Sequence, residues 1–330
     1  MADLQKLEQD IFRIDNEDEF NRVALEVFRF QYDHNGVYRR FCDALGKKPS
    51  PSGSYQDIPF MPIEFFKQHK ILSVAHTPDL VFSSSGTTGM QTSSHYVHKP
   101  ALYIRSFMES FRMFMGEPSD YHILALLPGY LERQGSSLIY MVNHLIEESR
   151  SNHSGFYLHD VEGLVQKVKA LHDDPRKVLL LGVSFALLDM SERYRVEHPR
   201  LLVMETGGMK GRRKEMIRSE LHQALCQAFG VKRICSEYGM TELLSQAWSL
   251  GDGVFVSPPW MRVLARDVND PLSRAARGAS GGLSVIDLAN LYSCSFIATQ
   301  DLMKELPGQS FEVLGRFDSS DIRGCNLMIA

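Results

Sequence analysis

The sequence has few cysteines, and their spacing shows no pairing. Five occur in 330 residues, an odd number, and no two form a C-x-x-C pair. A disulfide framework or a zinc site needs clustered or evenly numbered cysteines, so neither is expected. The pattern is typical of a protein in a reducing compartment, and we expect a cytoplasmic location.

Long apolar runs and a surplus of basic charge are also missing. No apolar stretch approaches the ~18 residues of a membrane-spanning helix, and the polar, acidic residues 1–10 contain no signal-peptide core. Lys and Arg number 36 against 40 Asp and Glu, for a net charge of −4. A basic surplus is the usual sign of nucleic-acid or anionic-lipid binding. We therefore expect no nucleic-acid partner and no membrane span.

The remaining composition predicts a folded α/β protein. Hydrophobic residues make up 44% of the chain, and from residue 79 short β-like runs alternate with helices, as in a mainly parallel sheet. After about residue 250 the pattern becomes strand-rich. We expect a helical segment over residues 1–50, an α/β nucleotide-binding core over 51–250, and a β-rich subdomain with a short C-terminal tail over 251–330.

The ends of some helices and strands can be predicted from the residues that usually begin or end them. Asn16 is positioned to cap a helix, with Glu19 as its reciprocal partner. Residues 212–229 have the apolar spacing of a helix that ends at Gly230. The expected strands include residues 178–183, 201–204, 231–235, 282–286 and 296–299.

A loop rich in hydroxyl groups and glycine is the most informative segment. Residues 83–89 read Ser-Ser-Ser-Gly-Thr-Thr-Gly and follow an apolar run. Small residues let backbone N–H groups converge, and the hydroxyls add donors, so the loop could cradle phosphates. It is not a Walker A loop, and the chain has no G-x-G-x-x-G or G-x-S-x-G motif. By residue type alone, an ordinary Ser/Gly/Thr turn is an equal alternative.

This loop resembles the first of four motifs of the AMP-forming adenylating superfamily, and the other three follow in order. Residues 236–242 resemble its Y-G-x-T-E motif, residues 300–302 its aspartate motif, and residues 315–318 its G-R-x-D motif. The superfamily includes acyl-CoA synthetases, luciferases and peptide-synthetase adenylation domains. The resemblance implies the α/β fold of an adenylate-forming enzyme, ATP and Mg²⁺ as cofactors, and a small carboxylic acid that becomes acyl-AMP.

The resemblance also assigns roles to single positions. Phosphates, adenine and ribose would be bound by Ser83, Ser84, Ser85, Gly86, Thr87, Thr88, Gly89, Gly207, Gly208, Tyr238, Gly239, Thr241, Asp301 and Arg316. Thr87 and Thr241 would contact the reacting phosphates, and Glu242 would hold Mg²⁺, which prefers carboxylate oxygen. Without the motifs, Tyr238 would be a core tyrosine, Glu242 a solvated glutamate at a helix start, Asp301 a loop aspartate, and Arg316 half of a surface ion pair.

The chain also departs from the superfamily pattern. The phosphate loop ends without the usual lysine, and Gln300 stands where glycine is usual. The sequence ends soon after the G-R-x-D motif, so we expect the mobile C-terminal domain with its catalytic lysine to be absent. Lys210 is a candidate for the missing cation because adenylation develops negative charge at the α-phosphate. The alternative is a solvated lysine beside Arg212 and Arg213.

These departures narrow the resemblance to the acyl-protein synthetases of bacterial bioluminescence operons, the LuxE type. Residues 205–211 and 323–327 carry it, and it runs from about residue 58 to the end. Such enzymes adenylate a fatty acid, pass the acyl group to a C-terminal cysteine, and then pass it to a partner reductase. Cys325 occupies the corresponding position, near a chain end, and Arg316 and Arg323 are close enough in sequence to favour its thiolate.

Three functions remain open at this point. The chain could be an acyl-protein synthetase that acylates Cys325, or a ligase that passes the acyl group to CoA or a carrier protein. It could also be a nucleotide-binding module that has lost catalysis, with Cys325 an incidental cysteine. The complete set of motif residues argues against the last, and the missing lysine argues for it.

Overall fold

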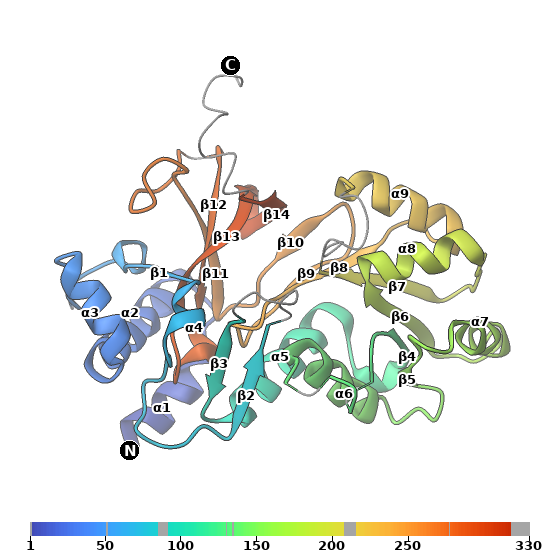
Figure 1. The fold of residues 1–330 in the computed structure, drawn as a ribbon, viewed down its shortest axis with the longest axis horizontal. Coiled ribbons are helices and arrows are strands. Elements are labelled where there is room, and N and C mark those ends of the chain that lie inside the picture. Colours follow the sequence, from blue (N-terminus) through green and yellow to red (C-terminus); the bar gives the residue numbers. More distant parts are fainter. Residues whose placement is uncertain are drawn as a thin grey trace. The chain divides into compact units, whose positions relative to one another are not determined.

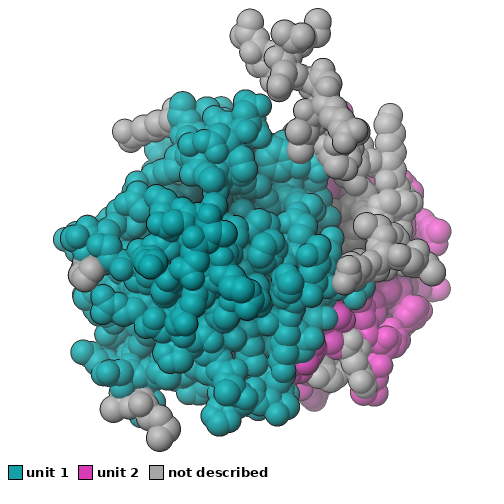
Figure 2. All heavy atoms as spheres, turned by 60° about the vertical axis from the view of Figure 1, so that its left-hand side comes forward, with its two compact units in different colours: residues 1–79, 89–99, 256–330 teal, residues 80–88, 100–255 magenta. Residues whose placement is uncertain are grey.

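The protein is described from a computed structural model, which covers residues 2–50, 52–84, 92–129, 131–133, 135–207, 216–276 and 278–317. The chain forms two compact units (Figure 1). Unit 1 comprises residues 1–79, 89–99 and 256–330, and unit 2 comprises residues 80–88 and 100–255, coloured teal and magenta in Figure 2. Each unit combines segments that are distant in the sequence, and the three-part division expected from composition stays a prediction.

Unit 2 contains a parallel α/β sheet with the strand order β8-β7-β6-β4-β5. Each neighbouring pair in this order is parallel, and β9 pairs with β8 in the antiparallel direction. Strands β4 and β6 are buried along almost their whole length, as expected where helices cover both faces. The strands are β2 (Leu80–Ser83), β4 (Tyr121–Leu126), β5 (Gly155–Phe156), β6 (Lys177–Val183), β7 (Leu201–Thr206), β8 (Cys235–Tyr238) and β9 (Ala247–Ser249). The helices are α5 (Pro100–Met115), α6 (Ser137–Ser149), α7 (Val161–Ala170), α8 (Ser184–Arg193) and α9 (Arg218–Phe229).

Two predicted boundaries in unit 2 were wrong. Helix α9 begins at Arg218, later than the predicted residue 212, although residues 212–215 lie outside the described part of the chain. Strand β8 begins at Cys235 and not at residue 231, because its pairing with β7 starts at Met204 and Cys235. The end of α9 is as predicted, since Gly230 caps it with a left-handed φ of 62°.

Unit 1 contains an antiparallel sheet in the order β11-β12-β13-β14, and β1 pairs with β13 in the parallel direction. The β-rich C-terminal part that the sequence predicts is therefore confirmed. The strands are β1 (Met61–Pro62), β3 (Ser94–Val97), β11 (Met261–Arg266), β12 (Ser280–Asp287), β13 (Phe296–Glu305) and β14 (Ser310–Arg316), while β10 (Val254–Val256) runs across the boundary between the units in the sequence. The helices are α1 (Ala2–Ile11), α2 (Glu17–His34), α3 (Gly36–Ala44) and α4 (Phe65–Gln68).

Helix α2 begins where the sequence predicts and contacts this sheet through Phe28 and Phe296. The Asn16 side chain accepts a hydrogen bond of 2.9 Å from the backbone N–H of Glu19, so the predicted cap is confirmed. Glu19 in turn accepts from the backbone N–H of Asp15, one residue before the cap. The buried amide of Gln31 donates to the carbonyl of Leu291 at 2.8 Å and accepts from the N–H of Ser295 at 2.9 Å. These bonds hold α2 to the segment before β13.

Of the helices that the structure describes, none combines the length and the apolar character needed to cross a membrane.

A buried histidine joins β4 to two loops of unit 2. Nδ1 of His122 lies 2.6 Å from the hydroxyl of Ser151. Its Nε2 lies 3.0 Å from Oδ1 of Asp174, without the direction of a hydrogen bond. Burial lowers the pKa of His122, and the nearby Arg176 and His153 act in the same direction, while Asp174 raises it by less. The pKa of His122 therefore lies below its ordinary value.

We expect the free energy of unfolding to decrease as the pH is lowered through ~6.5, the ordinary histidine pKa. The pKa of His122 is lower in the folded than in the unfolded state, so protonation favours unfolding, and the stability present above pH 6.5 is lost below it. Urea unfolding at about pH 8 and about pH 5.5 measures this difference. It should shrink in His122→Gln and persist in the control His159→Gln, which alters an exposed histidine. An undiminished pH dependence in His122→Gln would assign the effect to other groups.

Candidate active site

The candidate site in unit 2 lies at the carboxyl ends of two neighbouring parallel strands. Thr206, the last residue of β7, is the register partner of Glu237 in β8. Gly207 follows β7 directly with φ of 69°, a left-handed conformation that favours glycine. Ligands of α/β sheets bind at this edge because loops and helix starts converge there. The sequence therefore brings the glycine motif and the Y-G-x-T-E motif to the same edge of one sheet.

Tyr238 ends β8 and is largely buried. Its ring meets the ring of Phe255 edge to face, with centroids 6.0 Å apart and an interplanar angle of 67°. The guanidinium of Arg218 lies 5.0 Å from the centroid of Phe255. An aromatic side chain fixed in this way is a suitable platform for a flat base, although packing alone would also explain its burial.

The next residue, Gly239, has no room for a side chain. A Cβ at this position would lie 2.4 Å from Oε1 of Glu237 and 3.3 Å from Cγ of Gln246. Glu237 is itself buried and accepts a hydrogen bond from the hydroxyl of Thr206. A side chain at Gly239 would therefore displace the carboxylate of Glu237, a residue that the sequence analysis did not select.

Thr241 and Glu242 lie in the turn after β8, where the N–H of Leu243 donates to the carbonyl of Met240. The alternative of a solvated glutamate at a helix start was wrong, because Glu242 is 5% exposed and precedes no helix. No group of three or more His, Cys, Asp or Glu that could hold a metal ion occurs among the described residues. Magnesium is commonly held by one or two carboxylates together with substrate phosphates. A single buried carboxylate such as that of Glu242 fits this mode.

A buried charged network precedes the glycine motif, and the sequence analysis missed it. The carboxylate of Glu205 in β7 lies 2.8 Å from the hydroxyl of Ser184, which is also 2.7 Å from the carbonyl of Gly207. The other carboxylate oxygen of Glu205 lies 3.5 Å from Nε of Arg218 and 3.6 Å from Nε2 of His222. Burial raises the pKa of Glu205, but His222, Arg218 and the serines outweigh burial and hold the pKa below its usual value. The sequence did contain one sign of this network, because Glu205 is the only charged residue in the otherwise largely apolar strand β7.

We expect Glu205→Ala to lower the free energy of unfolding by about 2–3 kcal/mol, because the change leaves partly buried groups without their partner. The main groups affected are Arg218 and His222. Denaturant unfolding at neutral pH measures the change. The control Glu220→Ala alters an exposed glutamate in the first turn of α9 and should cost far less. Equal losses in both variants would contradict a stabilising role for the network.

The other two motifs lie in unit 1, in neighbouring strands. Asp301 in β13 is the register partner of Arg316 in β14, and Oδ1 of Asp301 lies 3.4 Å from Nε of Arg316. The prediction that Asp301 could be a loop residue was wrong, because β13 continues to Glu305. The side chain of Arg316 is 82% exposed, and such an ion pair contributes little to stability. Ligand roles for the two residues remain predictions.

Much of the predicted phosphate site lies outside the described residues. Ser83 ends β2, and its N–H donates to the carbonyl of Gly135 at 2.8 Å; Ser84 follows it. The predicted site residues outside the described part of the chain are Ser85, Gly86, Thr87, Thr88, Gly89, Gly208, Lys210 and Cys325.

Proteins that are similar in sequence belong to the enzyme type that the motifs indicate. Residues 7–119 match the family model described as acyl-protein synthetase, LuxE. A long-chain-fatty-acid–luciferin-component ligase of Aliivibrio fischeri is 24% identical over 339 residues, and one of Vibrio harveyi is 21% identical over 341 residues. Each alignment covers 94% of this chain and 87% of the relative. The similarity thus begins well before residue 58, where the motifs placed its start.

Solved structures with the same fold are ligases. A 2-hydroxyisobutyryl-CoA ligase in complex with 2-HIB-AMP and CoA matches with a TM-score of 0.66 at 14% identity, over 93% of this chain and 72% of the other. ATP-bound MatB from Rhodopseudomonas palustris matches with a TM-score of 0.56 at 16% identity, over 73% of this chain and 49% of the other. The predicted fold class is confirmed. The chain has the fold of the adenylate-forming ligases and is similar in sequence to the LuxE-type acyl-protein synthetases.

Proposed function

We propose that this chain activates a carboxylic acid with ATP to form acyl-AMP and pyrophosphate. The observation that carries the proposal is the convergence of Gly207 and residues 238–242 at the carboxyl ends of β7 and β8. Gly207 supplies exposed backbone without a side chain, Tyr238 an aromatic face, and Thr241 a hydroxyl donor. Glu242 supplies a buried carboxylate. Base, phosphate and metal ion could each find a partner of suitable chemistry in this set.

In the proposed reaction a carboxylate oxygen of the acid attacks the α-phosphorus of ATP. The bond from the α-phosphorus to the bridging oxygen breaks, pyrophosphate leaves with that electron pair, and a mixed anhydride forms. Thr241 would donate a hydrogen bond to the α-phosphate, where negative charge develops. Glu242 would hold Mg²⁺, which offsets the charge of the phosphates.

We propose further that the acid is a fatty acid and that Cys325 receives the acyl group. The names of the two bacterial relatives, long-chain-fatty-acid–luciferin-component ligase, support this choice of substrate. The thiolate of Cys325 would attack the acyl carbon, a thioester would form, and AMP would leave. A protein that then accepts the acyl group, such as a reductase or a carrier, is the proposed partner.

Pyrophosphate exchange tests the activation step. Purified protein is incubated with ATP, labelled pyrophosphate, Mg²⁺ and a panel of short-chain, long-chain and aromatic acids. Label should enter ATP only when both Mg²⁺ and the correct acid are present. No exchange with any acid would favour a nucleotide-binding module that has lost catalysis. Exchange without acylated protein, combined with acyl release to CoA, would favour a CoA ligase.

A further inference from the structure

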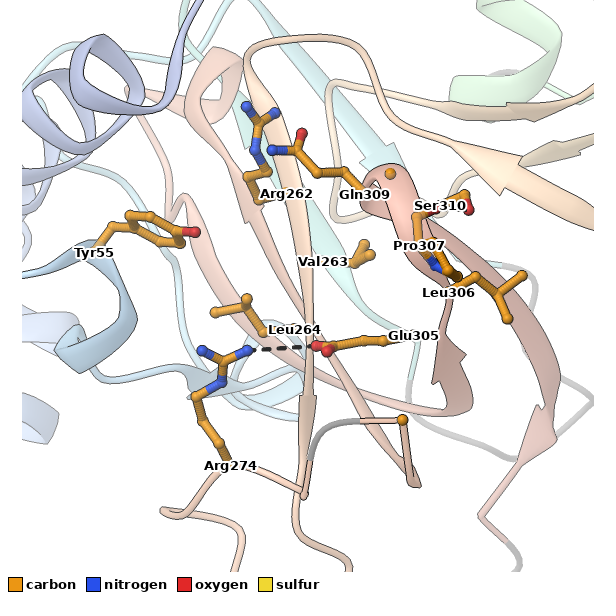
Figure 3. Close-up of a pocket in the computed structure, with 12 residues that line it drawn as sticks. Tyr55, Arg262, Val263, Leu264, Arg274, Glu305, Leu306, Pro307, Gln309 and Ser310 are labelled. Carbon is orange, nitrogen blue, oxygen red and sulfur yellow. Dashed lines mark hydrogen bonds and ion pairs between the residues drawn. The ribbon is translucent and has the colours of Figure 1, made fainter.

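Unit 1 contains a cavity that none of the motifs explains. Its volume is about 380 Å³, at the lower end of the range for small-molecule sites. Strand β11, the end of β13, the short helix η4 (Pro307–Gln309) and η1 (Tyr55–Asp57) contribute its walls (Figure 3). Glu305 in this wall is four residues beyond Asp301 on β13, about 13 Å at ~3.3 Å per residue. The cavity is therefore separate from the Asp301–Arg316 pair.

Arg262 is the notable group in the wall, because one edge of its guanidinium has no hydrogen-bond acceptor among the described residues. Nη1 donates to the carbonyls of Pro259 and Met261, both at 3.0 Å. Nε is buried and has no hydrogen-bond partner among the described residues. The carboxylate of Glu17 comes no closer to Nη2 than 3.9 Å. Nε and Nη2 form the edge of an arginine that binds a carboxylate through two parallel hydrogen bonds.

The neighbouring charges do not replace such a partner. Glu17 already accepts from the hydroxyl of Tyr55 at 2.6 Å and from the amide of Gln309 at 3.3 Å. Arg274 and Glu305 pair at 3.5 Å on the side of the cavity away from Arg262, as Figure 3 shows. Arg274 and Glu305 therefore balance each other, and Glu17 is the anion near Arg262, without a hydrogen bond to Nε or Nη2.

The surroundings of Arg262 make its positive charge costly to hold. Its side chain is only 12% exposed. A cation–π contact, 4.3 Å from the guanidinium to the centroid of the Phe20 ring, offsets part of the cost of this burial. Burial lowers the pKa of Arg262, and Glu17 offsets this only in part. A carboxylate against Nε and Nη2 would supply the hydrogen bonds that this edge lacks among the described residues.

The rest of the wall indicates what else the ligand carries. Apolar side chains line it beside Arg262, namely Val263, Leu264, Leu306 and Pro307. We propose that this cavity binds a small carboxylate with a short apolar body, and that the carboxylate is held by Nε and Nη2 of Arg262. The proposal does not depend on the adenylation activity, because it assigns a second site within unit 1.

Nuclear magnetic resonance of the arginine Nε–H groups tests the proposal directly. Protein labelled with ¹⁵N is titrated with hexanoate, with the neutral analogue hexanamide, and with inorganic phosphate. Arg262→Lys keeps the positive charge but removes the paired N–H donors of the guanidinium. The Nε–H resonance that is missing from the spectrum of this variant therefore belongs to Arg262. Val263→Phe narrows the cavity and leaves Arg262 in place. Arg29→Lys, which alters an exposed arginine of α2, is the matched control.

Hexanoate should shift the Arg262 Nε–H resonance saturably, and hexanamide should not. Val263→Phe should weaken this binding at least ten-fold, whereas Arg29→Lys should leave it unchanged. An Arg262 resonance that does not respond to hexanoate would overturn the proposal, and so would an equal response to hexanamide or to phosphate. A response that survives Arg262→Lys would belong to another acid site, such as the proposed catalytic one, and would also count against the cavity.

Discussion

Glu242→Ala is expected to reduce acid-dependent pyrophosphate exchange by roughly 100-fold or more. A single contact to charge that moves in the transition state is worth ~3 kcal/mol in the interior of an active site. The carboxylate of Glu242 is buried in the turn after β8, on the same sheet edge as Gly207. If this carboxylate holds Mg²⁺ as proposed, its removal should affect the rate much more than the fold. Initial exchange rates at saturating ATP and acid measure the effect.

Two further variants make this result specific. Glu242→Gln keeps the size of the side chain and removes its charge, so it should lose activity to a similar degree. Glu162→Ala alters an exposed glutamate in the first turn of α7 and should exchange at the wild-type rate. Circular dichroism of each variant tests the fold. A folded Glu242→Ala protein that exchanges at the wild-type rate would remove Glu242 from the metal-binding role.

Cys325→Ser is expected to abolish the hydroxylamine-sensitive acyl adduct and to leave pyrophosphate exchange intact. The other four cysteines are poor acceptors, because burial raises the pKa of each thiol, to about 12 for Cys42. Cys42, Cys235 and Cys294 are also buried, and Cys226 is partly exposed. Few of these thiols would be present as the reactive thiolate at neutral pH. Mass spectrometry of the intact protein and of its C-terminal peptide, after incubation with ATP, Mg²⁺ and acid, locates the adduct.

Cys226→Ser is the matched control, since Cys226 is the most accessible of the four described cysteines. It should acquire the same adduct as the wild type. A serine at position 325 could instead form an ester that resists hydroxylamine. An equal hydroxylamine-sensitive label on Cys325→Ser would assign the acceptor role to a different cysteine.

The fold class could be predicted because the motifs lie at strand ends, where local sequence and topology agree. The apolar runs that became β6 and β7 were recognisable, since parallel strands buried on both faces consist almost wholly of apolar residues. The strand boundaries were harder to predict from the sequence. The polar sequence after residue 299 gives no sign of a strand, and β13 continues to Glu305 because β14 supplies hydrogen-bond partners there. Such an extension depends on tertiary pairing and not on local propensity.

The site was predictable to the extent that its residues belong to motifs. Glu205 and Glu237 lie within the segments that carry the resemblance, but the motifs assign them no role. Their importance follows only from what surrounds them: Ser184 and Arg218 for one, Thr206 and Gly239 for the other. The cavity beside Arg262 is even harder to predict from the sequence. Its lining comes from segments up to two hundred and more residues apart in the sequence, and no periodicity brings them together.

The order of segments in unit 1 affects how the protein is made. A ribosome completes α1, α2 and α3 first, but β11 and β13, whose residues α2 and α3 contact, are synthesised much later. Until residue 296 has emerged, Gln31 lacks its hydrogen-bond partners, and Phe20 and Phe28 on the same helix lack their contacts with Arg262 and Phe296. The sheet of unit 2, from β4 to β9, can form during that interval. The nascent chain therefore carries an exposed apolar helix face through most of its synthesis, the condition in which chaperones bind and aggregation competes with folding.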